Sequence, residues 1–250
     1  MFSWCAPRKS LSIVAHRGAS AAAPENTLSA FRAALAEGAD AIELDVRLTA
    51  DNELVVIHDA SLYRTANGRG LVADTTLAEI RRLDAGRWFD RRFAGERIPT
   101  LMEVLEIVPM SIGVNVELKP EHGARKGADL VDRACRVIAR CKREASVLVT
   151  SFHYPLVALS KKRHPEIPTG ILLHPLRQSA RSPVRIATAI GADYIVFGSR
   201  TLSKRLTQKA HERGIRVAEY TVNTEYRLNR ARRYGVDAII TNCPRMMRQL

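Results

Sequence analysis

The sequence predicts a (β/α)8 barrel, a fold in which eight parallel strands alternate with helices that pack around them. From about residue 100 onward, short apolar runs of strand length alternate with segments of helical periodicity, which is typical of a parallel sheet. Eight strand positions can be counted along the chain, and this number favours a closed barrel over an open sheet. The length of 250 residues is typical of one such barrel, so we expect a single domain over residues 1–250.

The first part of the chain is expected to hold one strand and one helix. Residues 1–10 are interpreted as a short leader, and the apolar run 11–15 as the first strand. A loop with a proline follows, in which Asn26 or Thr27 is suited to cap the next helix. Apolar residues at helical spacing predict that helix over residues 28–38, where a glycine ends it.

The second strand carries the most informative pattern in the chain. Residues 41–48 alternate apolar and charged side chains with the period of a β-strand, so Glu43 and Asp45 share one face. Taken alone, this alternation is typical of a solvent-exposed antiparallel strand. Two carboxylates on one face in an apolar setting, however, need a basic side chain or a metal as partner. After a turn at 51–53, the apolar run 54–57 is expected to pair back as a hairpin or to continue as an adjacent strand.

A long irregular segment separates these elements from the regular repeats. Between residues 60 and 99 the sequence has a turn at 67–70, a short predicted helix at 77–83 and several aromatic residues. The segment is too long for an ordinary connection, and long loops tend to be functional or to form small subdomains. We therefore expect an insertion after the second strand that covers one mouth of the barrel.

The remaining elements follow a strand–helix rhythm. Strands are predicted at residues 112–119, 147–152, 169–173, 193–197, 215–222 and 237–241. Helices are predicted at residues 101–108, 128–142, 155–163, 183–190, 203–213 and 225–234.

The composition indicates a globular protein with a basic surface. No apolar run reaches membrane-spanning length, so no stable membrane insertion is expected. The first residues lack the pattern of a signal peptide, and we expect a cytoplasmic location. The net charge of +13 is compatible with nucleic acid, an anionic membrane or an anionic substrate. Because the arginines are spread over nearly every helix and no nucleic-acid motif is present, we expect a solvated basic surface and no nucleic-acid partner. The sequence does not indicate an oligomeric state.

The cysteines do not form a recognisable framework. Cys5, Cys135, Cys141 and Cys243 are scattered and show no CxxC spacing. We therefore expect free thiols and no zinc site.

Ionisable residues gather near the ends of three consecutive strands, where a barrel places its active site. They are His16, Arg17, Glu43, Asp45, His58, Glu117 and Lys119. Each has an ordinary explanation when taken singly, such as a structural histidine at a strand end or an ion pair between Glu117 and Lys119. The coincidence of all of them is hard to explain in this way, and it favours a catalytic site.

The residue types limit the chemistry of this site. The carboxylates Glu43, Asp45 and Glu117 make an oxygen site suited to a hard divalent cation such as Mg²⁺ or Ca²⁺. Arg17 and Lys119 add positive charge and directed donors that suit a phosphate oxyanion.

Two histidines complete this set. Because histidine side chains ordinarily titrate near neutrality, His16 and His58 are expected to suit a general acid and a general base. A metal, a cationic clamp and two histidines together indicate cleavage of a phosphoester. The chain has no nucleophile elbow, GxGxxG or GxxxxGK[ST] motif, so acyl transfer, dinucleotide binding and ATP binding are not favoured.

The motifs that hold these residues resemble those of the glycerophosphodiester phosphodiesterase family, and they do so over nearly the whole chain. The matching segments are residues 16–20, 24–27, 43–46, 58–59, 64–68, 85–89, 98–101, 115–120, 221–223 and 235–241. The resemblance implies a barrel with a small insertion after the second strand. It also implies hydrolysis of glycerophosphodiesters to glycerol 3-phosphate and an alcohol such as choline or ethanolamine.

The resemblance also assigns roles to the candidate residues. It implies metal ligation by Glu43, Asp45 and Glu117, acid–base catalysis by His16 and His58, and phosphate binding by Arg17 and Lys119. The resemblance implies a course in which the substrate's own glycerol hydroxyl attacks to give a cyclic phosphate that water then opens. The sequence is equally compatible with direct attack by water.

The chain departs from the family pattern near its C-terminus. Tyr220 stands where a tryptophan is usual, and Glu219 stands where relatives are usually apolar. The closing segment 241–244, which commonly has an acidic residue before its proline, reads Thr-Asn-Cys-Pro. If Glu219 faces the barrel interior, it alters the pocket, so these differences bear on the choice of alcohol.

Two other functions are compatible with part of the pattern. The first is a lysophospholipase D-like hydrolase that acts on lysophospholipids at membranes, but no obvious apolar or amphipathic anchoring segment is present. The second is a non-catalytic barrel that binds phosphate esters or nucleic acid by charge, which the intact histidines and carboxylates argue against.

Overall fold

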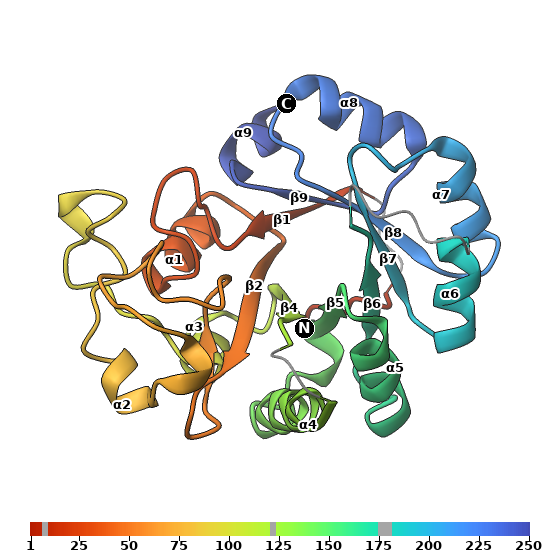
Figure 1. Cartoon of the computed structure of the whole chain (residues 1–250). Coiled ribbons are helices and arrows are strands. Elements are labelled where there is room, and N and C mark those ends of the chain that lie inside the picture. The colour runs from red at the N-terminus through yellow and green to blue at the C-terminus, as the bar shows by residue number, and fades with distance from the viewer. Residues whose placement is uncertain (7–9, 121–123, 175–181) are drawn as a thin grey trace.

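Eight parallel strands close into a barrel, and helices surround it (Figure 1). The structure is a computed structural model that describes residues 1–6, 10–120, 124–174 and 182–250. The barrel strands are β1 Ser12–His16, β2 Ala41–Leu48, β4 Gly113–Leu118, β5 Val147–Ser151, β6 Thr169–Leu172, β7 Tyr194–Gly198, β8 Arg216–Tyr220 and β9 Ala238–Thr241. Strand β1 pairs with both β2 and β9, which closes the barrel. The predicted fold class is confirmed.

A ninth strand extends β2 outward. Strand β3, Leu54–Val56, pairs antiparallel with the end of β2, so the hairpin is the correct one of the two expected arrangements. The hairpin lies outside the parallel ring and leads directly to the inserted segment.

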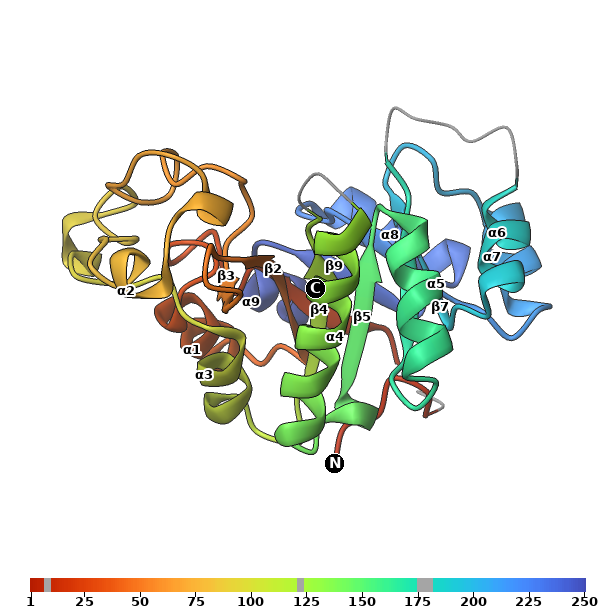
Figure 2. The same ribbon diagram turned by 60° about the horizontal axis from the view of Figure 1, so that its bottom comes forward.

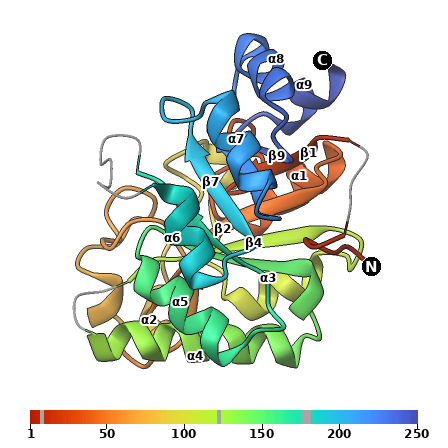
Figure 3. The same ribbon diagram turned by 90° about the vertical axis from the view of Figure 1, so that its right-hand side faces the viewer.

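Nine helices lie in the described residues, and all but α2, which belongs to the inserted segment, lie around the barrel. They are α1 Leu28–Ala36, α2 Leu77–Ile80, α3 Leu101–Ile107, α4 Ala124–Arg140, α5 Tyr154–Arg163, α6 Pro183–Ile190, α7 Lys204–His211, α8 Glu225–Tyr234 and α9 Pro244–Gln249. Short 3-10 helices lie at Val72–Asp74, Arg91–Phe93 and Glu144–Ser146. Figure 3 shows α4 to α8 beside one another around the barrel. Helix α9 is not among the predicted helices, because its six residues are too few to show helical periodicity. Among the described residues, no helix is both long enough and apolar enough to span a membrane.

The N-terminal residues close the base of the barrel. Phe2 and Trp4 are buried among inward-facing strand residues, and the Trp4 indole donates to the Ser146 carbonyl at 3.0 Å. An added Cβ at Gly113 would lie 2.5 Å from the Phe2 ring, so glycine makes room for it there. The expectation of a mere leader is therefore wrong, since these side chains complete the core.

The inserted segment has a small core of its own. Val55 of β3 and the adjacent Ile57 pack in this core with the buried side chains of the segment, which are Leu62, Ala66, Val72, Ile80, Ala85 and Ile98. In Figure 2 the segment lies to one side of the barrel, near α1 and α3, and extends toward the end at which the barrel strands finish. The helix predicted at 77–83 ends at Ile80, inside this compact segment.

Candidate active site

Parallel strand pairing brings the predicted site residues together. In the sheet, Glu43 lies opposite His16 of β1 and opposite Asn115 of β4, and Asp45 lies opposite Glu117. Because side chains alternate along a strand, all of these point into the barrel near its C-terminal end. The apolar residues between them pack outward against the helices. The alternation in β2 therefore separates a helix-facing core from a polar barrel mouth.

The three carboxylates form one buried cluster. Oxygen atoms of Glu43, Asp45 and Glu117 all lie within 4.8 Å of one another. Burial, together with Asp45 and Glu117, raises the pKa of Glu43 well above its usual range. Burial and the Asp45 charge also raise the pKa of Glu117, to about 7, although Lys119 opposes them. Burial disfavours ionisation of Asp45 too, but Lys119 and Arg17 outweigh it and hold the Asp45 pKa below its usual range.

Two basic side chains border this cluster. Lys119 Nζ lies 3.2 Å from Asp45 Oδ1 and 2.5 Å from Glu117 Oε1. Arg17 Nε lies 3.4 Å from Asp45 Oδ2, and the Arg17 backbone amide donates to Glu43 Oε2 at 3.0 Å. Two cations thus face three buried carboxyl groups, one more than they can neutralise, and the raised pKa values of Glu43 and Glu117 reflect this shortage of positive charge. Such a set of oxygen donors fits a hard divalent cation.

Both candidate histidines line the same cavity, and each is held through Nδ1. His16 Nδ1 lies 2.7 Å from Asn242 Oδ1, and His58 Nδ1 lies 2.6 Å from Asp59 Oδ1. Because both partner oxygens are acceptors, each Nδ1 carries the proton and each Nε2 keeps its lone pair. Burial, and then Arg17, lowers the pKa of His16 to about 4. Burial also lowers the pKa of His58. Both rings are therefore neutral near pH 7.

The cavity at the barrel mouth has one polar side and one largely apolar side. Its volume is about 180 Å³. Six of the seven predicted residues line it, and the seventh, Asp45, is buried next to them. The lining residues that sequence reasoning did not assign to the cavity are Asn115, Phe152, Leu172, Tyr220, Thr221 and Ile240. Phe152, Leu172 and Ile240 carry no signal for such a role, because core packing explains apolar strand residues equally well. Asn115 and Thr221 stand in segments that match the family and Tyr220 stands beside one, so the motifs held a signal for these three.

The loop before α1 supplies a further polar contact. Thr27, one of the two expected caps, accepts the Ala30 amide and caps α1. Asn26, the other, instead donates from Nδ2 to Asp45 Oδ2 at 2.8 Å. Its backbone has a φ of 60°, a left-handed conformation that asparagine adopts more readily than most residues. The loop therefore caps the helix with one residue and holds a carboxylate of the cluster with the other.

Arg47 supports the opposite side of the site. Its Nε donates to the backbone carbonyl of His58 at 2.9 Å. By the period of the strand Arg47 shares a face with Glu43 and Asp45, a position from which the sequence suggests no more than a supporting ion pair. The contact shows that it helps to hold the turn that carries His58.

The two unusual residues of β8 face opposite sides. Glu219 is fully buried toward the helix layer and forms an ion pair with Arg230 of α8. Glu219 therefore does not enter the pocket, and its expected influence there is excluded. Tyr220 points inward, lines the cavity and donates its hydroxyl to the Leu173 carbonyl at 2.7 Å.

Gly18, next to Arg17, is expected to tolerate no side chain. Its φ is +82°, and an added Cβ would lie 2.6 Å from the Ala30 carbonyl carbon. We expect Gly18→Ala to reduce the free energy of unfolding by about 2–4 kcal/mol, through left-handed strain and overpacking together. Gly214→Ala is the matched control, because Gly214 also has positive φ but has open space around its Cβ position. Urea unfolding of both variants measures the difference, and equal losses would contradict the packing argument.

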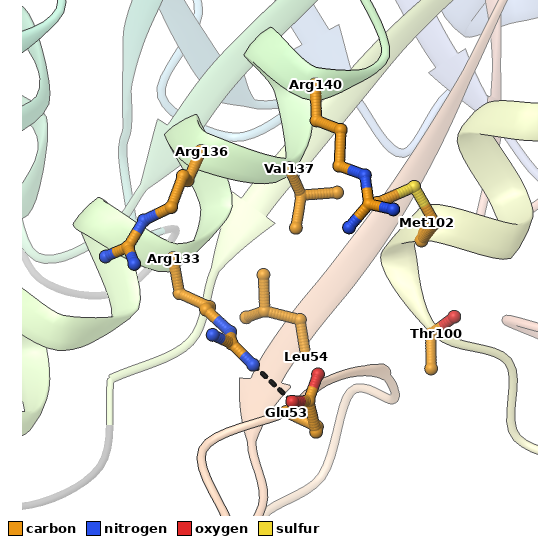
Figure 4. A pocket seen from close by; sticks show the side chains of 8 residues that line it. All are labelled: Glu53, Leu54, Thr100, Met102, Arg133, Arg136, Val137 and Arg140. Carbon is orange, nitrogen blue, oxygen red and sulfur yellow. Dashed lines mark hydrogen bonds and ion pairs between the residues drawn. The ribbon is translucent and has the colours of Figure 1, made fainter.

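A second cavity of about 260 Å³ lies outside the barrel (Figure 4). Its lining residues are Glu53, Leu54, Thr100, Met102, Arg133, Arg136, Val137 and Arg140. Arg133 points to Glu53 and forms an ion pair with it. This lining holds no histidine and one carboxylate, so it offers neither a metal-ligand set nor an acid–base pair. The acid–base and metal-ligand groups described above gather at the barrel mouth instead.

Comparison with known proteins agrees with this geometry. Residues 16–246 match the sequence model of the glycerophosphoryl diester phosphodiesterase family. A putative glycerophosphodiester phosphodiesterase of Bacillus subtilis is 36% identical over 93% of this chain and 94% of its own length. A glycerophosphodiester phosphodiesterase of Caldanaerobacter subterraneus is 37% identical over the same shares of the two chains.

Solved structures show the same architecture. A putative glycerophosphoryl diester phosphodiesterase of Silicibacter pomeroyi superposes with a TM-score of 0.89 at 27% identity, over 98% of this chain and 94% of that chain. A phosphodiesterase of Oleispira antarctica, in complex with the product sn-glycerol-3-phosphate, has a TM-score of 0.88 at 29% identity, over 95% of both chains. The chain therefore belongs to the glycerophosphoryl diester phosphodiesterase family.

Proposed function

We propose that the protein uses a divalent cation, Mg²⁺ or Ca²⁺, to hydrolyse glycerophosphodiesters such as glycerophosphocholine or glycerophosphoethanolamine to glycerol 3-phosphate and an alcohol. The observation that carries this proposal is the set of charges at the barrel mouth, where three carboxylates, two cations and two neutral histidines surround one cavity. The Oleispira neighbour, whose product is sn-glycerol-3-phosphate, supports the same reaction.

The carboxylates of Glu43, Asp45 and Glu117 would hold the cation. When bound there, the cation supplies Lewis-acid polarisation of the phosphoryl group. Arg17 and Lys119 bind phosphoryl oxygens from the sides of the same cavity. Their side chains are 18% and 12% exposed, so solvent screens their charges less than it would at the surface.

His16 and His58 move the protons. The histidine that acts as general base takes the proton of the attacking hydroxyl on its free Nε2 as a new P–O bond forms. The histidine that acts as general acid must first bind a proton on Nε2, and it gives that proton to the alcohol oxygen as the bond to phosphorus breaks. In the course that the family resemblance favours, the substrate's glycerol hydroxyl attacks first and water then opens the cyclic phosphate. Detection of the cyclic phosphate by ³¹P NMR during turnover would distinguish this course from direct attack by water.

Residues 60–99 act as a cap in this proposal and belong to the same single domain as the barrel. The segment extends toward the end of the barrel that holds the cavity, and the turn that carries His58 leads into it. A cap at this position limits the access of bulk water to the reacting groups.

The proposal predicts which substrates release glycerol 3-phosphate. Purified protein with Mg²⁺ or Ca²⁺ is expected to release it from glycerophosphocholine or glycerophosphoethanolamine, as measured by a coupled dehydrogenase assay. Lysophosphatidylcholine in the same panel tests the lysophospholipase D alternative, which predicts release of choline instead. Absence of turnover of every glycerophosphodiester, with either metal present, would refute the proposal.

A further inference from the structure

Arg64, in the inserted segment, forms hydrogen bonds with two carboxylates, Asp59 and Glu25, that lie on opposite sides of the candidate site. The Arg64 guanidinium donates to Asp59 from Nε at 2.6 Å and from Nη2 at 3.2 Å. It also donates to Glu25 from Nη1 and Nη2, both at 2.8 Å. Each carboxylate is thus held by two N–H groups of one planar fork, an arrangement that a lysine ammonium cannot reproduce.

Each of these carboxylates holds a residue of the candidate site. Asp59 Oδ1 lies 2.6 Å from Nδ1 of His58. Glu25 Oε1 accepts from Nη1 of Arg17 at 2.7 Å. Arg64 is therefore one contact removed from a candidate proton-transfer group and, on its other side, from a candidate phosphate-binding group.

We propose that Arg64 is a positioning residue that fixes the tautomer of His58 and the orientation of Arg17 at the same time, and so makes the inserted segment part of the catalytic machinery. The proposal rests on the function proposed above for the roles of His58 and Arg17. It concerns residues of this chain and needs no contact between Arg64 and the substrate.

The tautomer argument follows from the charge of Asp59. Hydrogen bonds from Arg64 are the main cause that holds the Asp59 pKa below its usual range, so this carboxylate is ionised and only accepts. His58 must then donate from Nδ1 and present the lone pair of Nε2. Without Arg64, the Asp59 side chain is free to rotate, and His58 is free to adopt the other tautomer.

The orientation argument concerns Glu25 and Arg17. Arg17 has a long side chain with several rotatable bonds, and its guanidinium is held between Asp45 on one side and Glu25 on the other. Arg64 fixes the Glu25 end of this chain of alternating charges. Without Arg64, the ion-paired side chains of Glu25 and Arg17 can move together, and the Arg17 guanidinium no longer has a fixed orientation toward the phosphate.

Because Arg64 is partly exposed, a positioning role and a purely structural role predict different effects of its removal. Its side chain is 43% exposed, and ion pairs in such positions contribute little to the free energy of unfolding. A purely structural role therefore predicts small effects on both stability and rate. A positioning role predicts a small effect on stability together with a large effect on rate.

Arg64→Ala and Arg64→Lys are the variants that test this role. Arg64→Ala is expected to keep its Tm and to lose about 10–100-fold in kcat/KM, as is typical when a supporting residue is removed or a reacting group is misplaced. Arg64→Lys should fall in between, because one ammonium cannot hold both carboxylates. Free guanidinium ion should partly restore Arg64→Ala. Arg81→Ala is the matched control, since Arg81 also lies in the inserted segment and its ion pair with Glu103, at 2.7 Å, is remote from the cavity residues.

Two measurements without turnover keep this test independent of the proposed function. Long-range ¹H–¹⁵N NMR at pH 8 should show His58 protonated on Nδ1 in the wild type, and a shift toward the Nε2–H tautomer in Arg64→Ala. Calorimetry should show weaker binding of glycerol 3-phosphate by Arg64→Ala than by Arg81→Ala.

If the wild type turns over no glycerophosphodiester, the proposed function fails, whereas the NMR result still decides the role of Arg64. An unchanged His58 tautomer, with kcat/KM no lower than in Arg81→Ala, would overturn the inference. If Arg64→Ala does not fold, Arg64→Lys carries the same comparison.

Discussion

Replacing His58 with alanine is expected to lower kcat by about 10²–10⁴-fold, the usual contribution of a positioned general acid or base. The same loss is expected for His16→Ala. Both rings line the cavity with Nδ1 engaged, so each offers Nε2 to the reacting atoms. Binding of glycerol 3-phosphate should change much less, because the phosphate-binding side chains remain. Steady-state kinetics and calorimetry of the same samples measure the two effects.

A substrate with a good leaving group can show which histidine is the general acid and which is the general base. A p-nitrophenyl phosphodiester releases an anion that needs no protonation, so the variant that lacks the general acid should recover much of its rate on this substrate. The variant that lacks the general base should not. His164→Ala is the matched control, because His164 ends α5 and does not line the cavity. Small and equal losses of rate and binding in both cavity variants would favour a barrel that binds phosphate esters without catalysis.

Removal of the divalent cation is expected to abolish turnover. Three buried carboxylates within 4.8 Å repel one another, and Arg17 and Lys119 offset part of their charge. Dialysis against EDTA should therefore stop the release of glycerol 3-phosphate, and addition of Mg²⁺ or Ca²⁺ should restore it. A saturating cation should also raise the free energy of unfolding, by about 2.7 kcal/mol at a hundred times its Kd.

One substitution in the carboxylate cluster tests the metal site directly. Glu117→Gln keeps the size of the side chain but removes one charged ligand, so it should lose both the activity and the stabilisation by the cation. Glu106→Gln is the matched control, because it removes the same charge from the exposed side of α3. Full activity in EDTA, or cation-dependent stabilisation that survives in Glu117→Gln, would contradict the assignment of the cluster as a metal site.

Much of the fold can be predicted from the sequence because local patterns determine it. The alternation in β2 depends only on the period of a strand, and the structure places Glu43 and Asp45 inward and the apolar residues outward, against the helices. The strand–helix rhythm beyond residue 100 reflects short-range propensities in the same way, and the barrel confirms it. The predicted site residues meet because parallel strands place their C-terminal ends at one mouth.

Other features depend on contacts between residues far apart in the chain. Sequence reasoning offered two caps for α1, and only packing shows that Thr27 caps it while Asn26 turns to Asp45. The direction of Glu219 depends on Arg230 in the helix layer, which provides its buried charge with a partner. A pattern within one strand cannot decide which charge will find such a partner.

The sequence by itself determined the barrel, the strand ends that carry charge and the seven residues of the candidate site, because each is encoded in a short stretch. Only the tertiary structure decided how these residues are supported. His16 meets Asn242 across 226 positions of the chain, and Arg64 joins Glu25 to Asp59 across the inserted segment. Closure of the barrel and docking of the insertion create these contacts. They depend on the relative placement of whole elements, and no local periodicity records that placement.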